Sequence, residues 1–578
     1  MRAVMGRSWS PVRAAALAGR IHVWRDALAL ALLLALSAPA RGEEVTSGLW
    51  AGGYDTPTAR IPVMARFETG GSGVRGSFYL LLERGRTMNL DGPAPEAAHL
   101  EFQAFSGTDT LNFSGDVRGD TILGAVRSAA LNPNAKFQLV RFREGSGAHA
   151  GTLQGDYDLG RRTLFIRALG SLLRYEDTGS GRFGLLFPSS DSTYFGGPSY
   201  LTTYPVEIQA TFRRDGRGLG SALTFSEPGS PPREAPRIQD YAVQNVEFPS
   251  GGLQLAAALF IPLPHPEKSP AAKLPAIVLV HSSSEGPRDS FGTLPSWLAL
   301  QGFEVLAADK RGSGKSGKGR GSASFLELAD DVAAAVQFLK SRPEVDSTRI
   351  GLVGESQGGG YTAPMAAARH KDIAFLVNLS GSCVTPAEEN LFQSEIRMKR
   401  EGYSDEAVAH AAGLQMRLHD YTRRGGDRKG LVAELQQSRP EKWYALTNLP
   451  GDPEQELPPP ERVGGSWWHE TLDLDRMPDW EKVTCPVLCL YGDRDDVIPV
   501  PEGIERFRKA QAKAGNTRSE IHVLPGATHD LWQAPAGRAW DVARTRGYAP
   551  GFRETVAKWL STFLADPTQR IDSGTRSR

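Results

Sequence analysis

Ser356 lies midway between two glycines in the segment 354–358, which reads Gly-Glu-Ser-Gln-Gly. The apolar run Ile350 to Gly354 precedes it, and the small-residue stretch Gly359 to Ala368 follows it. This order predicts a tight turn between a strand and a helix, which would lift the hydroxyl of Ser356 above the edge of a sheet. The sequence therefore predicts Ser356 as a nucleophile, and the alternative is a chance Gly/Ser-rich turn.

A serine hydroxyl attacks only when a base removes its proton, so a histidine is needed. Six of the eleven histidines follow Ser356, as the base should in a fold with this kind of turn, where the chain order is Ser, then acid, then His. His529 lies in a loop directly after the last predicted strand and is the predicted base. His469 is the one rival, because it adjoins two tryptophans that could line a pocket. The other four are expected to be packed in a strand (His522) or solvated on helices (His370, His410 and His419).

An acid must orient the imidazole and stabilise its charged form. The run from Tyr491 to Pro499 offers three carboxylates, at Asp493, Asp495 and Asp496. With these residues the chain resembles the α/β-hydrolase superfamily, in which Gly-x-x-Asp and an apolar-Pro ending follow this strand. Matched residue by residue, the resemblance selects Asp495 as the acid. It leaves the other two carboxylates as surface or loop-capping groups.

Acyl transfer also needs an oxyanion hole, formed by two backbone N–H groups aimed at the developing charge. The resemblance implies that one donor is Gln357, the residue after the nucleophile. The other should come from the loop His281 to Pro287. Family members usually carry His-Gly at its start, whereas this chain has His-Ser. Ser282 and Ser283 are therefore both candidates, and His281 is expected to be a structural loop residue.

Eight apolar runs alternate with amphipathic helical stretches in the second half of the chain. This pattern predicts an α/β fold with a doubly wound, mostly parallel, eight-stranded sheet. The strands are expected at Val243–Phe248, Leu253–Ile261, Ala276–Val280, Phe303–Ala308, Ile350–Gly354, Ala374–Leu379, Val487–Tyr491 and Ile521–Leu524. A capping box of Ser324 and Glu327 predicts a helix from Ser324 to Lys340, and the last helix is expected at Phe552–Leu564.

Two other segments of this half have alternative interpretations. Residues 312–316 resemble a phosphate-binding P-loop, but Asp309 occupies the place of the required first glycine. The run Asp309 to Gly312 instead resembles the loop after the fourth strand of many such hydrolases. Residues 384–475 are expected to form a helical cap, a common insertion in the family. Within the cap, Trp467 and Trp468 either bind an acyl or aryl group or form the cap's own core.

The first half of the chain shows short alternating apolar and polar runs broken by Gly, Asn and Asp. This pattern is typical of a β-sandwich or barrel. We expect two β-rich modules, at residues 43–147 and 148–225, which serve as a scaffold or bind a surface or polymer ligand. Four prolines indicate a linker at 226–240. The catalytic domain is expected at 241–566, before a disordered tail at 567–578.

Residues 1–42 have the features of a signal peptide, with five arginines before the apolar run Ala27 to Leu36. The sequence Ala38-Pro39-Ala40 provides a cleavage site, and an uncleaved anchor is the alternative. A periplasmic or secreted protein with no stable membrane insertion after cleavage is therefore expected. Lys plus Arg and Asp plus Glu both number 66, which disfavours nucleic acid as a partner. Three cysteines provide neither a disulfide framework nor a zinc site.

The resemblance covers roughly residues 243–565, and it is closest to exported bacterial carboxylesterases, acyl-thioesterases and prolyl-oligopeptidase-like hydrolases. It implies hydrolysis of a small-molecule carboxylic ester through an acyl-enzyme on Ser356, without a metal or organic cofactor. Hydrolysis of a thioester or peptide by the same residues is the first alternative. The second belongs to another class, a binding protein whose β modules hold a surface ligand and whose hydrolase domain is inert.

Overall fold

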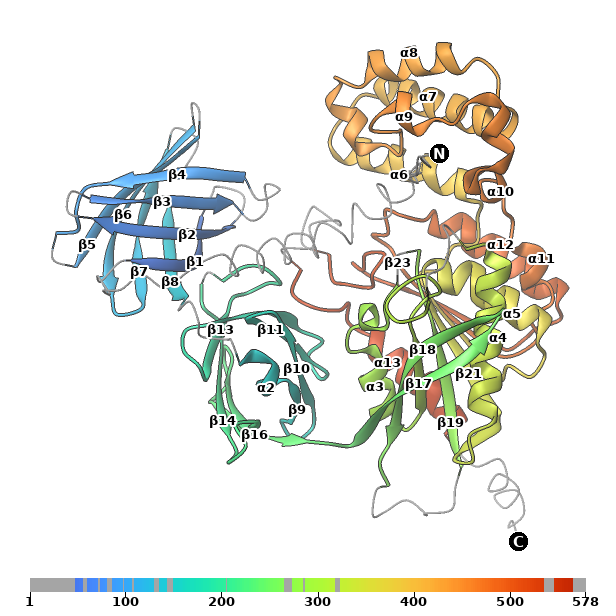
Figure 1. The fold of residues 1–578 in the computed structure, drawn as a ribbon, viewed down its shortest axis with the longest axis horizontal. Coiled ribbons are helices and arrows are strands. Elements are labelled where there is room, and N and C mark those ends of the chain that lie inside the picture. Colours follow the sequence, from blue (N-terminus) through green and yellow to red (C-terminus); the bar gives the residue numbers. More distant parts are fainter. Residues whose placement is uncertain are drawn as a thin grey trace, which may run out of the picture. The chain divides into compact units, whose positions relative to one another are not determined.

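The computed structural model describes residues 47–564 except 56–59, 71–72, 81–85, 97, 107–108, 129–134, 143–148, 204, 265–272, 284–285, 318–322 and 535–544. The expected signal peptide and the expected tail at 567–578 lie outside these residues. Two compact units divide the described chain. One comprises the residues before 240 together with 545–548. The other comprises residues 240–534 and 549–564 (Figure 1).

The first module is a closed barrel in which each strand pairs antiparallel with the next and β8 returns to β1. Aromatic rings fill its interior, and Phe102 stacks on Phe113 with ring centroids 4.5 Å apart. Its strands are β1 (Gly48–Asp55), β2 (Arg60–Gly70), β3 (Gly73–Leu80), β4 (Arg86–Gly92), β5 (His99–Ser106), β6 (Asp109–Arg118), β7 (Thr121–Arg127) and β8 (Lys136–Phe142).

The second module is also a closed barrel, and the short helix α2 (Ala150–Leu153) lies within its ring of strands (Figure 1). Its strands are β9 (Gly155–Asp158), β10 (Thr163–Leu169), β11 (Leu172–Asp177), β12 (Phe183–Pro188), β13 (Thr193–Gly196), β14 (Ile208–Arg214), β15 (Gly220–Ser226) and β16 (Arg233–Ile238). Residues 545–548 belong to this unit. There, the Phe183 N–H donates to the carbonyl of Arg546 (3.2 Å) and the Tyr548 N–H donates to that of Gly181 (2.9 Å).

The segment expected to be a linker is instead part of this barrel. Residues 233–238 form β16, which pairs with β15 and β9 and closes the ring of strands. Of these six residues only Ala235 is buried, so the strand is polar and lacks an alternating apolar signal. Pro236 takes part in the pairing with Ala222. The prolines therefore led to the prediction of a linker at a place where the chain forms an exposed strand.

The second half of the chain contains the expected eight-stranded sheet, in the order β17-β18-β20-β19-β21-β22-β23-β24. Both β17 and β20 pair antiparallel with β18, and all other pairs are parallel. The α/β-hydrolase fold expectation is thus confirmed. The strands are β17 (Tyr241–Ser250), β18 (Leu253–Pro262), β19 (Leu274–Val280), β20 (Glu304–Ala308), β21 (Val345–Glu355), β22 (Leu376–Leu379), β23 (Val487–Gly492) and β24 (Ser519–Leu524).

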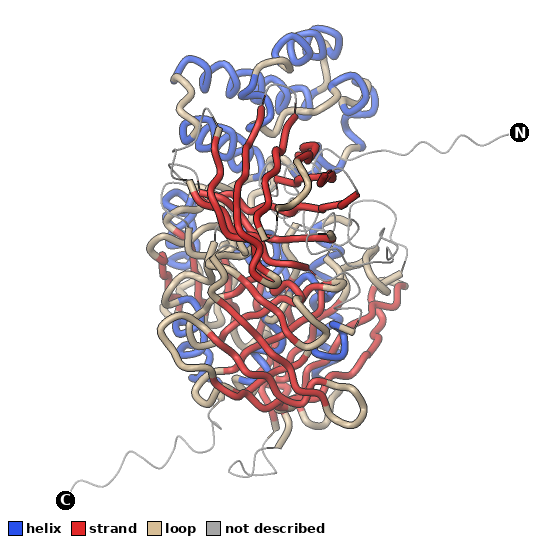
Figure 2. The backbone as a smooth tube through the Cα atoms, turned by 90° about the vertical axis from the view of Figure 1, so that its left-hand side faces the viewer, coloured by secondary structure: helices blue, strands red, loops and turns tan. Residues whose placement is uncertain are grey.

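Helices alternate with most strands of this sheet along the chain, and Figure 2 shows the backbone with helices in blue and strands in red. The capping box of Ser324 and Glu327 is present at the start of α4, as expected. The helices around the sheet are α3 (Leu294–Leu300), α4 (Phe325–Lys340), α5 (Ala363–Arg369), α11 (Met477–Trp480), α12 (Val500–Lys513) and α13 (Phe552–Leu560). Among the described residues, no helix is both long enough and apolar enough to span a bilayer.

A helical cap is inserted between β22 and β23, and Figure 1 shows most of its helices grouped together beyond the sheet. It comprises α6 (Pro386–Arg400), α7 (Asp405–Arg424), α8 (Arg428–Ser438), α9 (Pro453–Glu456) and α10 (Trp467–Thr471). The cap has an apolar core of its own, which includes Leu414, Leu435, Trp443 and Tyr444. This core allows the insertion to keep a defined shape over the sheet.

Candidate active site

Ser356 lies in a strained turn directly after β21. Its φ is 51°, a left-handed conformation that side chains other than glycine rarely adopt. The two flanking glycines make the turn possible. A Cβ on Gly354 would lie 2.6 Å from the backbone of Gly358, and a Cβ on Gly358 would lie 2.2 Å from the carbonyl oxygen of Val280. The sequence thus places the serine at the carboxyl end of a central strand, before a helical segment that starts with the π-helical turn Gly358–Thr362.

The three residues singled out for the triad form one hydrogen-bonded line. His529 Nε2 lies 2.9 Å from Ser356 Oγ, and His529 Nδ1 lies 2.8 Å from Asp495 Oδ2. The Asp495 side chain is fully buried, and its other oxygen accepts hydrogen bonds from the N–H groups of Val497 and Ile498. A buried carboxylate held in this way fixes the orientation of the ring and leaves Nε2 facing the hydroxyl.

The other carboxylates and histidines considered from the sequence have different partners. Asp493 accepts a hydrogen bond from the Gly526 N–H (2.7 Å), and Asp496 pairs with Arg400 (3.0 Å). The ring of His281 stacks on Phe291 and its Nε2 lies 2.6 Å from the carbonyl oxygen of Ala308. His469 Nδ1 lies 2.9 Å from the carbonyl oxygen of Thr422. None of these contacts joins Ser356.

The oxyanion hole has two candidate arms, Gln357 and the pair Ser282 and Ser283, which lie on neighbouring elements. Gln357 follows Ser356 at the start of a helical segment, where N–H groups have no partner within the helix. Ser282 and Ser283 lie in the loop after β19, which is hydrogen-bonded to β21. The tight packing of Gly358 against the carbonyls of Val280 and His281 brings the two arms together. Lys310 contacts both arms, a residue to which the sequence interpretation gave no role in the site.

Helix α6 of the cap presents a polar face to the residues around the triad. The Tyr361 hydroxyl lies 2.9 Å from Glu389 Oε1. Desolvation raises the pKa of Glu389 to about 7, against the opposing effects of hydrogen bonds from Ser382 and Tyr361. One helical turn on, Gln393 donates to the carbonyl of Val497 (3.0 Å) in the acid loop. The cap thus contributes polar groups beside the candidate triad, and these groups were not predicted from the sequence.

The two tryptophans of α10 lie outside the cap's own core. Trp467 packs against the core of the sheet domain and lies 6.3 Å from Phe325 of α4 between ring centroids. Its indole N–H donates to the carbonyl of Ala323 (3.3 Å), and Trp468 makes an edge contact with its ring at 5.4 Å. Trp467 thus anchors α10 on the sheet domain. A role for either side chain in substrate binding stays a prediction.

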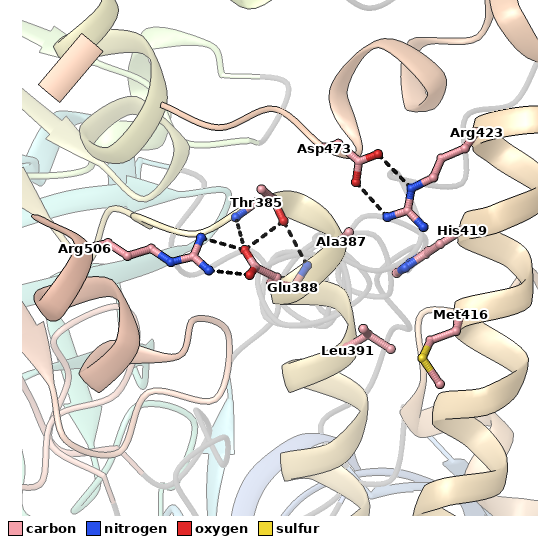
Figure 3. Close-up of a pocket in the computed structure, with 9 residues that line it drawn as sticks. All are labelled: Thr385, Ala387, Glu388, Leu391, Met416, His419, Arg423, Asp473 and Arg506. Carbon is pink, nitrogen blue, oxygen red and sulfur yellow. Dashed lines mark hydrogen bonds and ion pairs between the residues drawn. The ribbon is translucent and has the colours of Figure 1, made fainter. Parts of the chain in front are cut away.

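A cavity of about 390 Å³ lies between cap helices α6 and α7 and helix α12 (Figure 3). Its charged groups are paired with each other, Arg506 with Glu388 and Arg423 with Asp473. His419, expected to be solvated, is buried in its wall, and burial lowers its pKa to about 4. That expectation was wrong, because α7 turns this residue toward the inside of the cap. Among the described residues, no cluster of His, Cys, Asp and Glu could hold a metal ion.

Comparison with known proteins places the chain in a family. The model of the alpha/beta hydrolase family matches residues 277–541. The uncharacterized protein PA2218 of Pseudomonas aeruginosa is 36% identical over 302 residues, which are 49% of this chain and 73% of that protein. The chain belongs to the alpha/beta hydrolase family. The matched residues of this alpha/beta hydrolase contain Ser356, Asp495 and His529 together with the whole cap.

Other relatives match this alpha/beta hydrolase over shorter stretches. The uncharacterized protein YcjY of Escherichia coli is 33% identical over 118 residues, 20% of this chain and 37% of its own length. The chain thus spans well under half of that relative. Among solved structures, the esterase Pf2001 of Pyrococcus furiosus aligns with 56% of this chain and 94% of its own, at 16% identity and a TM-score of 0.34. The crystal structure of PA2218 aligns at 20% identity and a TM-score of 0.33, over 57% of this chain and 95% of its own.

Proposed function

We propose that this alpha/beta hydrolase cleaves carboxylic esters through an acyl-enzyme on Ser356. The single observation that carries the proposal is the hydrogen-bonded line from Ser356 through His529 to the buried carboxylate of Asp495. In this line each group has the partner that its chemical role requires. The hydroxyl faces a base, and the base is oriented by an acid.

The reaction follows from this arrangement. Ser356 Oγ attacks the ester carbonyl carbon while its proton passes to His529 Nε2, and the carbonyl oxygen takes up the negative charge. Collapse of this tetrahedral species breaks the bond to the alcohol oxygen, which leaves with the proton from His529. Water then attacks the acyl-enzyme in the same way, and the products are a carboxylic acid and an alcohol. Asp495 holds the ring throughout and stabilises its charged form.

The backbone N–H groups near the carbonyl oxygen supply the second part of the catalysis. Gln357 and one residue of the 282–283 pair are the candidates for these donors. Donors fixed in advance stabilise the developing charge without reorganising during the reaction, and loss of one such donor typically costs roughly 10²- to 10³-fold in kcat. The strained turn at Ser356 helps here, because it holds the nucleophile and the Gln357 N–H on one rigid segment.

The test is turnover of p-nitrophenyl esters of two to twelve acyl carbons by the wild-type protein and by Ser356→Ala. Ser341→Ala is the matched control, because Ser341 is exposed at the end of α4. We expect Ser356→Ala to lower kcat by roughly 10⁴-fold or more, and the control to leave it unchanged. Thioesters and dipeptide amides complete the panel. Faster cleavage of either class would replace the ester proposal, and an active Ser356→Ala would remove the nucleophile itself.

A further inference from the structure

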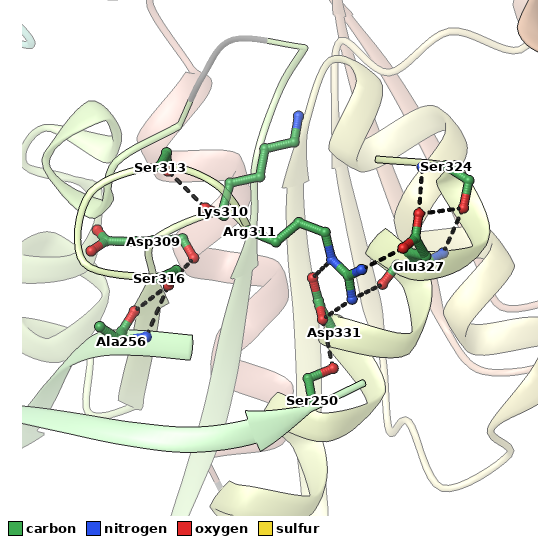
Figure 4. Close-up of polar contacts among 10 residues, drawn as sticks. All are labelled: Ser250, Ala256, Asp309, Lys310, Arg311, Ser313, Ser316, Ser324, Glu327 and Asp331. Carbon is green, nitrogen blue, oxygen red and sulfur yellow. Dashed lines mark hydrogen bonds and ion pairs between the residues drawn. The ribbon is translucent and has the colours of Figure 1, made fainter. Parts of the chain in front are cut away.

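Lys310 lies in the loop after β20, which is held by contacts that do not involve the lysine side chain. Asp309 pairs with Arg288 at 2.9 Å and accepts from the N–H of Lys315 at 2.7 Å. Arg311 pairs with Asp331, on the opposite side of the loop. Figure 4 shows the two basic side chains diverging: Arg311 extends to Asp331 and Lys310 extends away from it. The backbone of Lys310 is therefore fixed while its ammonium group serves another site.

That other site is the loop of the candidate oxyanion hole, which Lys310 holds at both ends. Its backbone N–H donates to the carbonyl oxygen of Gly286 at 2.8 Å. Its Nζ donates to the carbonyl oxygen of Ser282 at 3.1 Å. The same Nζ donates to the side-chain oxygen of Gln357 at 3.3 Å, on the other arm. One side chain thus connects the loop after β19 with the residue that follows the nucleophile.

The contact with Ser282 has a consequence for the next residue along the chain. The Ser282 carbonyl and the Ser283 N–H are the two ends of one planar peptide group, and in a trans peptide they point in opposite directions. An ammonium at the oxygen end orients this group and polarises it, so the Ser283 N–H points away from the lysine and becomes a stronger donor. Within the described part of the chain, neither this N–H nor that of Gln357 donates a hydrogen bond.

We propose that Lys310 is a positioning residue of the oxyanion hole, whose two donors are the N–H groups of Gln357 and Ser283. The proposal rests on the proposed function and extends it, because it assigns the second donor to Ser283 and not to Ser282. Lys310 acts through these two residues. It fixes the spacing of the two arms and places a positive charge behind the peptide that faces the developing negative charge.

The state of the lysine at neutral pH is consistent with this role. The residue keeps some exposed surface, and desolvation of its ammonium group lowers the pKa of the side chain to about 8. The group therefore carries its charge at pH 7. Two acceptors of its Nζ, the Ser282 carbonyl oxygen and the Gln357 side-chain oxygen, are neutral. The ammonium charge acts on both of these groups, and a partly desolvated site screens it less than bulk water does.

A fluorophosphonate probe tests the proposal without knowledge of the natural substrate. In its reaction Ser356 Oγ forms a bond to phosphorus, fluoride leaves, and the proton goes to His529. The phosphoryl oxygen gains negative charge in the transition state, as an ester carbonyl oxygen would. The second-order rate constant of labelling therefore reports on the oxyanion hole, and Ser356→Ala gives the blank.

Three substitutions separate the charge of Lys310 from its hydrogen bonds and its bulk. Lys310→Met keeps the aliphatic stem alone, Lys310→Gln keeps a neutral donor, and Lys310→Arg keeps the charge. Lys315→Met is the matched control, because Lys315 is exposed on the same loop. We expect Lys310→Met to lower the labelling rate by roughly 10- to 100-fold, Lys310→Gln by less, and Lys310→Arg to recover most of the rate. The control should match the wild type.

A residue with only a structural role would give a different pattern. On an ester that the wild type hydrolyses, we expect Lys310→Met to lower kcat and leave KM unchanged. Its melting temperature should stay within a few degrees of that of the wild type. Labelling of Lys310→Met, or of Lys310→Gln where Met prevents folding, within twofold of the wild-type rate overturns the proposal. A wild type that is labelled at Ser356 but inactive on esters removes the ester assignment alone. A wild type that is not labelled removes both.

Discussion

Nη1 of Arg400 lies 3.0 Å from Oδ2 of Asp496. This ion pair connects the cap helix α6 to the loop that carries Asp495, the acid of the candidate triad. Asp496 directly follows Asp495, and Gln393 of the same helix donates to the carbonyl of Val497. The orientation of Asp495 depends on this loop, because its carboxylate accepts hydrogen bonds from the loop's own N–H groups. The cap therefore has a structural connection to the candidate triad.

Replacement of Arg400 by methionine tests this connection. We expect Arg400→Met to lower kcat by about 10-fold and to destabilise the protein by roughly 1–3 kcal/mol, because the mostly buried carboxylate of Asp496 loses one of the two arginines, Arg397 and Arg400, whose charges stabilise it. Burial already raises the pKa of Asp496 above its usual range. The control is Lys399→Met, since Lys399 is exposed and its ammonium pairs along the helix with Glu395. The measurements are ester turnover and urea denaturation, and equal effects of the two substitutions would argue against the connection.

Glu304 predicts a pH dependence of stability that has no counterpart in activity. It begins β20, at the opposite end of the strand from the loop of Lys310, and its side chain is fully buried. Desolvation, and then the charge of Glu344, raise the pKa of Glu304 from 4.5 to about 7. Below pH 4.5 both the folded and the unfolded chain bind the proton. Between pH 4.5 and 7 only the folded chain keeps it, so this group lowers the free energy of unfolding as pH rises.

Glu304→Gln removes that loss, because the neutral amide does not ionise. We expect the variant to be more stable than the wild type by roughly 1–3 kcal/mol at pH 8 and to show no such gain at pH 4.5. Glu247→Gln, at an exposed position of β17, should show no gain at either pH. Denaturant unfolding at the two pH values checks this. A gain of the same size at both would mean that ionisation of Glu304 is not its cause.

Two glycines in helical segments should respond in opposite ways to alanine. A Cβ on Gly358 would lie 2.2 Å from the carbonyl oxygen of Val280, so Gly358→Ala must push the helical segment after Ser356 away from the loop after β19. We expect at least a 100-fold loss of kcat, or loss of the folded protein. Around Gly413 in α7 nothing lies within 4 Å of an added Cβ. Gly413→Ala should therefore stabilise the protein, by up to about 1 kcal/mol, and leave kcat unchanged. Thermal melts and ester turnover of the two variants provide the comparison.

The sheet and the candidate triad could be predicted from the sequence because their signals are local. A strand buried on both faces has to be a continuous apolar run, as in Ala276 to Val280. The turn at Ser356 has to have small residues on both sides, because the backbone atoms of neighbouring segments fill the space. In both cases packing restricts the residue types within a few positions, so the pattern can be recognised without the tertiary structure.

Other features depend on contacts between residues far apart in the chain, and no local pattern contains them. β16 closes a barrel with a single buried side chain, so its sequence has the composition of a linker. Lys310 follows a buried strand, in a loop whose sequence first suggested phosphate binding or a generic connection. A lysine is usually exposed. Only the tertiary structure, which brings three distant segments together, shows that its ammonium group reaches Ser282 and Gln357. The contacts of α6 with the acid loop are of the same kind.

The pKa of Lys310 predicts an alkaline limit of activity that is separate from unfolding. Its folded value is lowered from 10.5 to about 8, so the ammonium loses its charge as pH rises through 8. If the charge supports the oxyanion hole, kcat falls in this range. The contribution of Lys310 to stability, in contrast, increases as pH rises. Between pH 8 and about 10.5 the unfolded chain binds the proton and the folded chain does not, so this group raises the free energy of unfolding with pH.

The arginine variant decides whether the lysine causes that limit. An arginine keeps its charge throughout this range, so Lys310→Arg should keep its kcat between pH 8 and 9.5 while the wild type declines. Initial rates on a p-nitrophenyl ester, with Ser356→Ala as the blank for spontaneous hydrolysis, give the profile. Circular dichroism at each pH shows whether the protein is folded. An alkaline decline of the same midpoint in wild type and Lys310→Arg would assign the limit to another group and separate Lys310 from the catalytic step.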